Sequence, residues 1–387
     1  MDVTSYRRAE ALGKSSLRDW RLPYAHMPPT FVDHGFPVRI ESVDDLLLIL
    51  DTMQEDRFDM FVQELRGLSN EEVQELITAM TQFVGFYLAH FPGEEVQIPL
   101  STFIGQLAIA IKIRQLPNRK SVLEVGPGCG YISYFIRNDA AIERYHTVET
   151  TESFYLLQSM LNASIFGATY RNHARIDGRG TGIGNLGALE GREANAKHFW
   201  AFEDYYALDI ERTPRMEMFP WWKLGEVMDN SYDLIMMNAN LTEFSHGAFL
   251  HYLNITMKTL APEGYVFCQC QGGGELELSM ILNTMFEEGL YPVAMLPGSM
   301  RKLEEDRQFV VSNFLFVRRT HSSIPEKPSL EHSIPKIDTS DPLSRAVFGF
   351  DRQPQHMVPR LQALNLVASG VKALYGFEAS PITSAGG

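Results

Sequence analysis

The sequence has 387 residues, of which 45% are hydrophobic and 21% are charged, and its formal net charge is −14. These proportions are typical of a globular protein with a large core, and the length allows two or three domains. No basic stripe interrupts the acidic balance, so nucleic acid is not an expected partner, because its phosphates are held by clustered Lys and Arg side chains.

Cysteine usage and the N-terminus indicate the compartment. The three cysteines, Cys129, Cys268 and Cys270, are too few and too badly placed for a disulfide framework, which favours a reducing environment. The first residues contain no apolar core of signal-peptide type, and no window reaches the roughly 18 apolar residues of a membrane span. We therefore expect a cytoplasmic protein with no membrane span.

Residues 1–118 are predicted to form an arm and a helical cap domain. The arm, residues 1–40, is rich in Arg, Tyr, Pro and His without clear periodicity, so no secondary structure is assigned to it, although it could pack over another part of the protein. Beyond it, apolar residues recur at intervals of three and four, and Ser69 and Glu72 have the spacing of a capping box. Helices are therefore expected over 42–53, 56–68, 69–91 and 101–116.

Residues 119–320 alternate between strand-like and helix-like runs. The expected strands are 121–125, 145–149, 231–239, 264–270, 291–296 and 308–319. The expected helices lie near 130–138, 152–166, 245–260 and 275–288. This alternation predicts an α/β fold with a Rossmann-like, mostly parallel sheet and helices on both faces, and the last two strands are close enough to pair at an antiparallel edge.

Two further segments have no place in that alternation. Residues 175–195 contain six glycines, and they are predicted to form a surface loop or lid because no strand precedes them and no apolar helix follows. Residues 321–387 begin as a proline-rich linker and end in a helical tail over 361–377. That tail is expected either to dock back on the protein or to contact a second subunit in a homodimer.

A glycine-rich turn follows the strand 121–125 in the stretch SVLEVGPGCGY. The dinucleotide fingerprint G-x-G-x-x-G would need glycine at position 131, where the chain has Tyr131, so NAD is not the expected ligand. The closely spaced Gly126, Gly128 and Gly130 let the backbone come near a ligand. Cys129, between two of them, is interpreted as a small filler residue and not as a nucleophile.

Two carboxylates accompany this turn. Glu124, on the strand before it, can reach an amine or the polar tail of a ligand. Glu149 ends the next predicted strand, where a carboxylate can accept hydrogen bonds from both ribose hydroxyls of an adenosine. The turn and the second acid together predict a site for a nucleoside without a pyrophosphate.

The E-x-G-x-G-x-G pattern with an acid at the next strand tip resembles the S-adenosylmethionine site of class I methyltransferases. Three further stretches, TVETTESFYLLQSMLN, FPWWKL and NANLTEFSHGAFLHYL, resemble a group described as sugar O-methyltransferases, over roughly residues 100–320. The resemblance implies S-adenosylmethionine as cofactor and a sugar or natural-product hydroxyl, as in secondary metabolism, as acceptor. The cofactor-binding residues that it implies are Glu124, Gly126, Gly128, Gly130, Tyr131, Glu149 and Asn238.

Methyl transfer from a sulfonium is an in-line displacement, so a hydroxyl acceptor also needs a base that removes its proton. Asn238 and Asn240 end the strand that should open beside the methyl group, and Glu243 and His246 follow it. By the resemblance Asn238 and Glu243 match the family's Asn and Glu, with Glu243 as the expected base and His246 as the second candidate. A helix N-terminal charge for Glu243 and a structural role for His246 stay open.

Trp221 and Trp222 are predicted to line the acceptor pocket, where aromatic faces can stack on a sugar ring or stabilise a cation. The second property keeps a C-methyltransferase open, one that acts on an alkene carbon such as that of an isoprenyl diphosphate. Its diphosphate could be clamped, with Mg²⁺, by the arginines of the arm, Arg7, Arg8, Arg18 and Arg21. A third hypothesis is a non-catalytic protein that binds S-adenosylmethionine.

Overall fold

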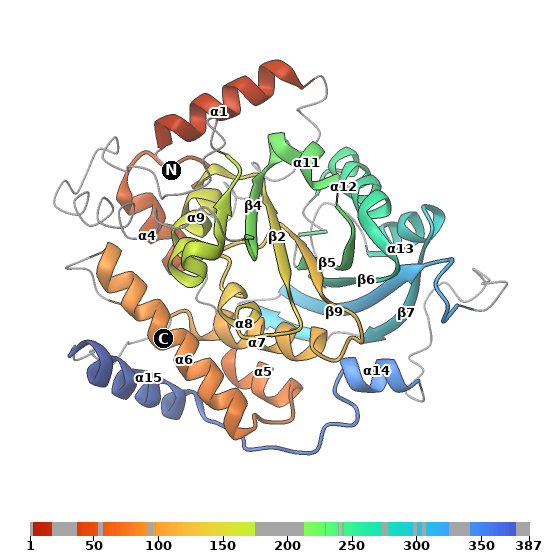
Figure 1. The fold of residues 1–387 in the computed structure, drawn as a ribbon. Helices are drawn as coiled ribbons and strands as arrows, with labels where there is room; N and C mark the ends of the chain where they lie inside the picture. Colours follow the sequence, from red (N-terminus) through yellow and green to blue (C-terminus); the bar gives the residue numbers. More distant parts are fainter. Residues whose placement is uncertain are drawn as a thin grey trace.

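The computed structural model describes residues 3–17, 37–52, 57–91, 96, 98–174, 213–228, 230–238, 240–241, 244–271, 278–296, 300–303, 307–324 and 341–376. A central β-sheet with helices on both sides dominates this part of the chain (Figure 1). The loop or lid predicted over 175–195 and most of the proline-rich linker lie outside the described residues.

The strand order of the sheet is β3-β4-β2-β1-β5-β6-β9-β7, with β8 paired to β9. Neighbours from β3 to β6 are parallel, whereas β9 runs antiparallel to both β6 and the outermost strand β7. This confirms the predicted Rossmann-like fold class, a mostly parallel sheet with antiparallel pairing at one edge. The strands are β1 (Ser121–Val125), β2 (Arg144–Glu149), β3 (Tyr170–Asn172), β4 (Met216–Pro220), β5 (Tyr232–Asn238), β6 (Leu260–Gln271), β7 (Leu290–Leu296), β8 (Met300–Leu303) and β9 (Arg307–Arg318).

The sheet is covered on both faces, which explains why its central strands are apolar at nearly every position. Alternate residues of β1 point to different cores: Val122 belongs to one apolar cluster and Leu123 to the other. The first cluster includes residues of α7 (Leu100–Ile113), α8 (Ser133–Ile136) and α9 (Glu152–Phe166), and the second includes residues of α11 (Leu224–Met228), α12 (His246–Thr259) and α13 (Leu278–Glu287).

The expected N-terminal helices are present as α4 (Val43–Thr52), α5 (Phe58–Glu64) and α6 (Asn70–His90), followed by α7. The capping box at the start of α6 is confirmed, because the Ser69 side chain accepts from the Glu72 backbone and the Glu72 side chain accepts from the Ser69 backbone. The arm also contains a helix that its sequence did not reveal, α1 (Val3–Ser16), which lies at the top of Figure 1.

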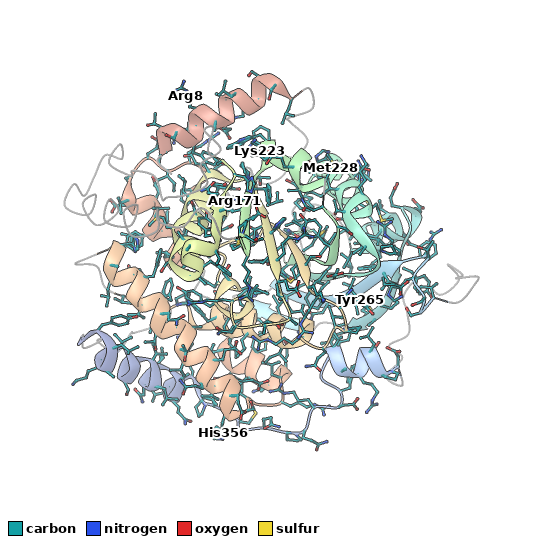
Figure 2. All side chains as sticks on the ribbon, viewed as in Figure 1. Arg8, Arg171, Lys223, Met228, Tyr265 and His356 are labelled. Atoms are coloured by element: carbon teal, nitrogen blue, oxygen red, sulfur yellow. The ribbon has the colours of Figure 1, made fainter. Side chains whose placement is uncertain are left out.

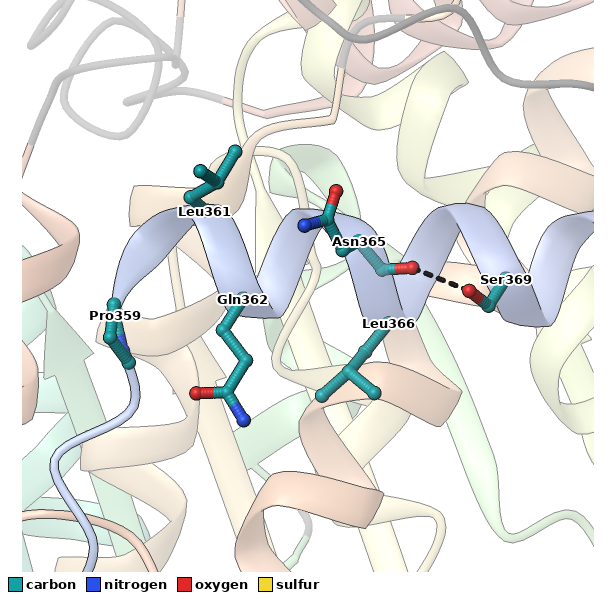
Figure 3. Close-up of a pocket in the computed structure, with 6 residues that line it drawn as sticks. All are labelled: Pro359, Leu361, Gln362, Asn365, Leu366 and Ser369. Atoms are coloured by element: carbon teal, nitrogen blue, oxygen red, sulfur yellow. Dashed lines mark hydrogen bonds between the residues drawn. The ribbon is translucent and has the colours of Figure 1, made fainter.

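The C-terminal tail docks back on the protein. It contains α14 (Pro342–Val347) and α15 (Arg360–Tyr375), and α15 lies along α6, with Ala363, Val367 and Val371 fully buried. The opposite side of α15 is open, with Leu361 69% exposed (Figure 3). Two roles were predicted for this tail, and the structure shows the first of them, docking on its own chain.

Candidate functional site

Three glycines after β1 adopt a backbone conformation that other residues rarely take. Their φ angles are 64° at Gly126, 61° at Gly128 and 74° at Gly130. The turn is held to the sheet because the Gly126 amide donates to the Val148 carbonyl, 2.8 Å away. Positive φ and a close neighbour together require glycine here. The turn therefore exposes backbone polar groups at the carboxyl edge of the sheet, where ligands of such folds bind.

Gln158, on α9, ties this turn to the end of β2. Its side-chain amide donates both to the Gly128 carbonyl and, over 3.0 Å, to the Glu149 carboxylate. A Cβ on Gly130 would lie 3.0 Å from the Gln158 Cγ, so the absence of a side chain at Gly130 is what lets Gln158 pass. Gln158 was not among the predicted site residues, although it stands in the stretch TVETTESFYLLQSMLN on which the resemblance rests, because its place on a helix does not reveal that it reaches the turn.

Glu149 is buried where β2 ends. Its Oε1 atom accepts from the backbone amides of Thr150, at 2.8 Å, and Thr151, at 3.0 Å. Burial raises the pKa of its carboxyl to about 7, against the lowering effect of these hydrogen bonds. A buried acid with a strongly raised pKa at a sheet edge is a candidate ligand-binding group.

Glu124 is the second buried acid of the site, on β1. It accepts from the Tyr145 hydroxyl and from the Asn238 side-chain amide, the latter over 3.2 Å. Burial and, to a smaller extent, the nearby Glu149 raise its pKa to about 7, against the lowering effect of the two hydrogen bonds. The structure thus brings together Glu124 and Asn238, two of the predicted site residues from different strands.

The raised pKa of Glu124 predicts a pH-dependent stability. An unfolded Glu titrates near ~4.3, so the folded state holds this proton more tightly, and the resulting stability is lost as pH rises towards 7. We expect Glu124→Gln to reduce the fall in unfolding free energy between pH 5 and pH 8 by about 2 kcal/mol. Urea unfolding at both pH values measures this. Glu143→Gln, at an exposed carboxylate, is the control, and an equal fall in wild type and Glu124→Gln would contradict the prediction.

The other residues predicted near the turn occupy supporting positions. Asn240 is buried and donates to the Val125 carbonyl, its amide lying where a Cβ on Gly126 would be 2.9 Å away. The Tyr131 ring stacks on Phe103 in the helical layer, with ring centroids 4.8 Å apart. Asn240 therefore supports the start of the glycine turn through its hydrogen bond to Val125. The Tyr131 ring belongs to the core between α7 and α8.

The Cys129 thiol, between two of the glycines, is also buried. Burial raises its pKa to about 12, so it carries almost no thiolate at neutral pH. This agrees with its interpretation as a filler residue.

A row of amides next to Glu124 was not predicted. Asn238 of β5, Gln269 of β6 and Asn313 of β9 are register partners across three neighbouring strands, so their side chains share one face of the sheet. The Asn313 Oδ1 atom lies 3.4 Å from the Gln269 Nε2 atom and 3.4 Å from the ammonium of the buried Lys112 on α7. Each of these residues lies in a largely apolar strand, and only the strand register reveals the row.

The structure does not test the predicted base, Glu243, or its alternative, His246, as neighbours of this row of amides. Glu243 lies outside the described residues. His246 is the first residue of α12 and is exposed, with Ser245 as the N-cap. Their catalytic roles stay predictions.

The two tryptophans follow β4, which is separated by β2 and β1 from β5, the strand of Asn238. Pro220, which precedes them, is the register partner of Glu149. Trp221 is fully buried, and Trp222 packs against Tyr6 of α1, with ring centroids 5.0 Å apart. They therefore lie beside the Glu149 end of the site, and their predicted role in an acceptor pocket is untested.

The arginines of the arm have different surroundings. Arg7 donates to the buried Glu152 carboxylate at 2.8 Å and to Glu41 at 2.8 Å. Arg8 is exposed on the outer side of α1 (Figure 2). Arg18 and Arg21 lie outside the described residues. Because Arg7 is already bound by carboxylates, it does not support the diphosphate clamp.

Among the described residues no group of three or more His, Cys, Asp or Glu side chains is arranged to hold a metal ion, so the predicted Mg²⁺ gains no support. Within those ranges, too, no helix has the length and apolar character needed to cross a bilayer.

Two hollows lie outside the glycine turn. A cavity of about 310 Å³ lies between α5, α7 and α14, with Lys112 in its wall. A shallow hollow of about 400 Å³ lies on the outer side of α15 (Figure 3).

The sequence matches no protein-family model and no curated protein. Among solved structures it is similar to a TehB-like SAM-dependent methyltransferase from Corynebacterium glutamicum, with 12% identity, a TM-score of 0.33 and coverage of 55% of this chain and 87% of that one. It is also similar to the N-methyltransferase NodS from Bradyrhizobium japonicum in complex with S-adenosyl-L-homocysteine (9% identity, TM-score 0.34, 61% and 98% covered). A third is an O-methyltransferase from Bacillus cereus (11%, 0.33, 67% and 96%). At these values they do not identify the activity of this chain.

Proposed function

We propose that this protein is a class I S-adenosylmethionine-dependent methyltransferase that acts on a small-molecule acceptor. One observation carries the proposal: Gln158 joins the left-handed glycine turn after β1 and the buried Glu149 at the end of β2 into a single unit. A turn of this kind allows close approach of a ligand to the backbone, and the carboxylate suits two neighbouring hydroxyls. Both features are needed for an adenosine and neither provides for a pyrophosphate.

The residues present fit the cofactor. Glu149 would accept the ribose hydroxyls, the glycine turn would lie along the ligand, and Glu124 would hold the amino group of its tail. The buried Oδ1 atoms of Asn238 and Asn240 have no hydrogen-bond partner among the described residues, as expected of groups that face a polar ligand. When bound, S-adenosylmethionine supplies an electrophilic methyl group, whose transfer to a hydroxyl leaves a thioether.

The amide row supports a polar acceptor. Asn238, Gln269 and Asn313 extend from Glu124 across the carboxyl ends of β5 and β6 to the adjoining part of the antiparallel strand β9, next to the proposed position of the cofactor tail. Amide groups recognise hydroxyls by donating to and accepting from them. An apolar acceptor in the same place would leave the buried amides without hydrogen-bond partners. This favours O-methylation of a sugar or another polyhydroxylated compound, with Glu243 as the proposed base.

C-methylation of an isoprenyl diphosphate is the second candidate, and the described residues favour it less. It would need an aromatic wall beside the methyl group and cations for the diphosphate. Trp221 and Trp222 are buried at the Glu149 end of the site, and Arg7 pairs with Glu152. A non-catalytic protein that binds S-adenosylmethionine would not need the amide row.

A screen of hydroxylated acceptors tests the proposal. Purified protein is incubated with S-adenosylmethionine and a panel of sugars, polyols and phenols, with and without Mg²⁺, and S-adenosylhomocysteine release and the mass of the product are measured. We expect methyl transfer to a polyhydroxylated acceptor that does not require added metal. Transfer only to isoprenyl diphosphates would favour the second candidate, and cofactor binding without any turnover would favour the third.

Once an acceptor is found, Gln269→Leu tests the amide row. The substitution keeps the side-chain volume roughly constant and removes one hydrogen-bonding group, so we expect the acceptor KM to rise about tenfold. The affinity for S-adenosylhomocysteine should stay within about twofold of wild type, because Gln269 lies two strands away from the glycine turn. An unchanged KM would remove this row from the acceptor site.

A further inference from the structure

The N-terminal helix α1 is attached to two segments that start close to Glu149. Arg7 of α1 and Arg39 bind the carboxylate of Glu152, which is the first residue of α9 and lies three residues after Glu149. Gly13 of α1 lies against Trp222, so closely that a Cβ there would be 2.5 Å from the Trp222 Cβ. Trp222 in turn lies two residues after Pro220, the register partner of Glu149.

Tyr6 lies in the middle of this attachment. Its ring contacts Tyr155 of α9 on one side and Trp222 on the other, with centroid distances of 5.1 Å and 5.0 Å. The side chain is fully buried, yet its hydroxyl has no hydrogen-bond partner within the described ranges. Burial raises the pKa of this hydroxyl, and the carboxylates of Glu10, Glu152 and Glu149 raise it as well, against the lowering effect of the Arg39 guanidinium.

A buried hydroxyl without a partner is costly, so each such group calls for an explanation, such as a bound ligand, ion or water. Glu149, to which the proposed function assigns the ribose of the cofactor, is one of the charged groups that act on the Tyr6 hydroxyl. Because, among the described residues, three carboxylates and only one guanidinium, that of Arg39, act on this hydroxyl, it is suited to a neutral group of the ligand and not to a carboxylate tail.

We propose, on the basis of the proposed function, that Tyr6 is a cofactor-binding residue whose hydroxyl donates a hydrogen bond to the nucleoside end of S-adenosylmethionine. Helix α1 then forms the wall of the cofactor site beside Glu149. The N-terminal arm, which lies outside the residues that carry the resemblance, would then complete the cofactor site.

Calorimetry with S-adenosylhomocysteine and with adenosine tests this inference on Tyr6→Phe. We expect a five- to tenfold loss of affinity for both ligands, because both contain the nucleoside, with no decrease in the melting temperature of the ligand-free protein. Tyr134→Phe is the matched control: it removes another buried hydroxyl that lacks a hydrogen-bond partner in the described region, near Tyr375 of α15, and it should bind both ligands as wild type does.

The outcomes separate the two proposals. Wild-type affinity in Tyr6→Phe would overturn the role of Tyr6 and leave the proposed function intact. A loss for S-adenosylhomocysteine but not for adenosine would also overturn it, since the contact would then be with the amino-acid tail. If wild type itself binds neither ligand, the proposed function fails, and the role of Tyr6 fails with it.

Discussion

Glu149→Ala should lower the affinity for S-adenosylhomocysteine at least 100-fold. The substitution removes a carboxylate that would accept hydrogen bonds from two ribose hydroxyls, and hydrogen bonds to charged groups contribute about 1.5–3 kcal/mol each. It also releases Gln158, whose amide donates to Glu149 and to the Gly128 carbonyl, so the glycine turn loses a support. Isothermal titration calorimetry at pH 8, above the raised pKa of Glu149, measures the effect.

Two variants control this experiment. Glu143→Ala removes an exposed carboxylate just before the opposite end of the same strand and should bind as wild type does. Glu149→Gln keeps the size of the side chain and one acceptor oxygen, so we expect an intermediate loss of about tenfold. Near-wild-type affinity in Glu149→Ala would show that the nucleoside does not bind at the end of β2.

Gly130→Ala should have the second-largest effect, lowering the affinity at least tenfold and the stability by about 1–3 kcal/mol. The backbone at Gly130 has a φ of 74°, which costs an L-residue about 1–2 kcal/mol. The new Cβ would also lie 3.0 Å from the Gln158 Cγ and displace the side chain that joins the turn to Glu149. Urea unfolding and calorimetry measure the two effects separately.

Gly225→Ala is the matched control for this variant. Gly225 lies in α11, and a Cβ there would meet no atom within 4 Å. Alanine is favoured over glycine in a helix, so stability should be unchanged or rise by up to about 1 kcal/mol, with no change in ligand affinity. If Gly130→Ala behaves like Gly225→Ala, the glycine turn is not under the conformational constraint described above.

The alternation of apolar runs predicted most of the sheet, and the reason is physical. Strands buried on both faces, such as β1 and β5, are apolar at nearly every position, and helices such as α9 show helical spacing. β4 escaped prediction because Glu217 interrupts its short apolar run and it ends at Pro220, next to the two tryptophans. α1 escaped because its buried side includes Glu10 and Gly13, which lie against Arg39 and Trp222 and give no apolar stripe.

The site was predictable mainly where its residues stand at the ends of strands. The glycine turn, Glu149 and Asn238 have such positions, and position alone indicates a ligand there. Gln158, Gln269 and Asn313 were not predicted, because their partners come from distant segments and depend on strand register. Tyr6 is the extreme case, since its neighbours Tyr155 and Trp222 are more than a hundred residues away in the chain.

Binding of S-adenosylhomocysteine and of NAD to the wild-type protein is the most direct measurement of the central claim. Calorimetry at pH 8 should show one S-adenosylhomocysteine bound per chain and no heat from NAD, because the turn provides for an adenosine and lacks the third glycine of the dinucleotide fingerprint at Tyr131. Binding of NAD, or the absence of any S-adenosylhomocysteine binding, would contradict the assignment of this site to a methyltransferase.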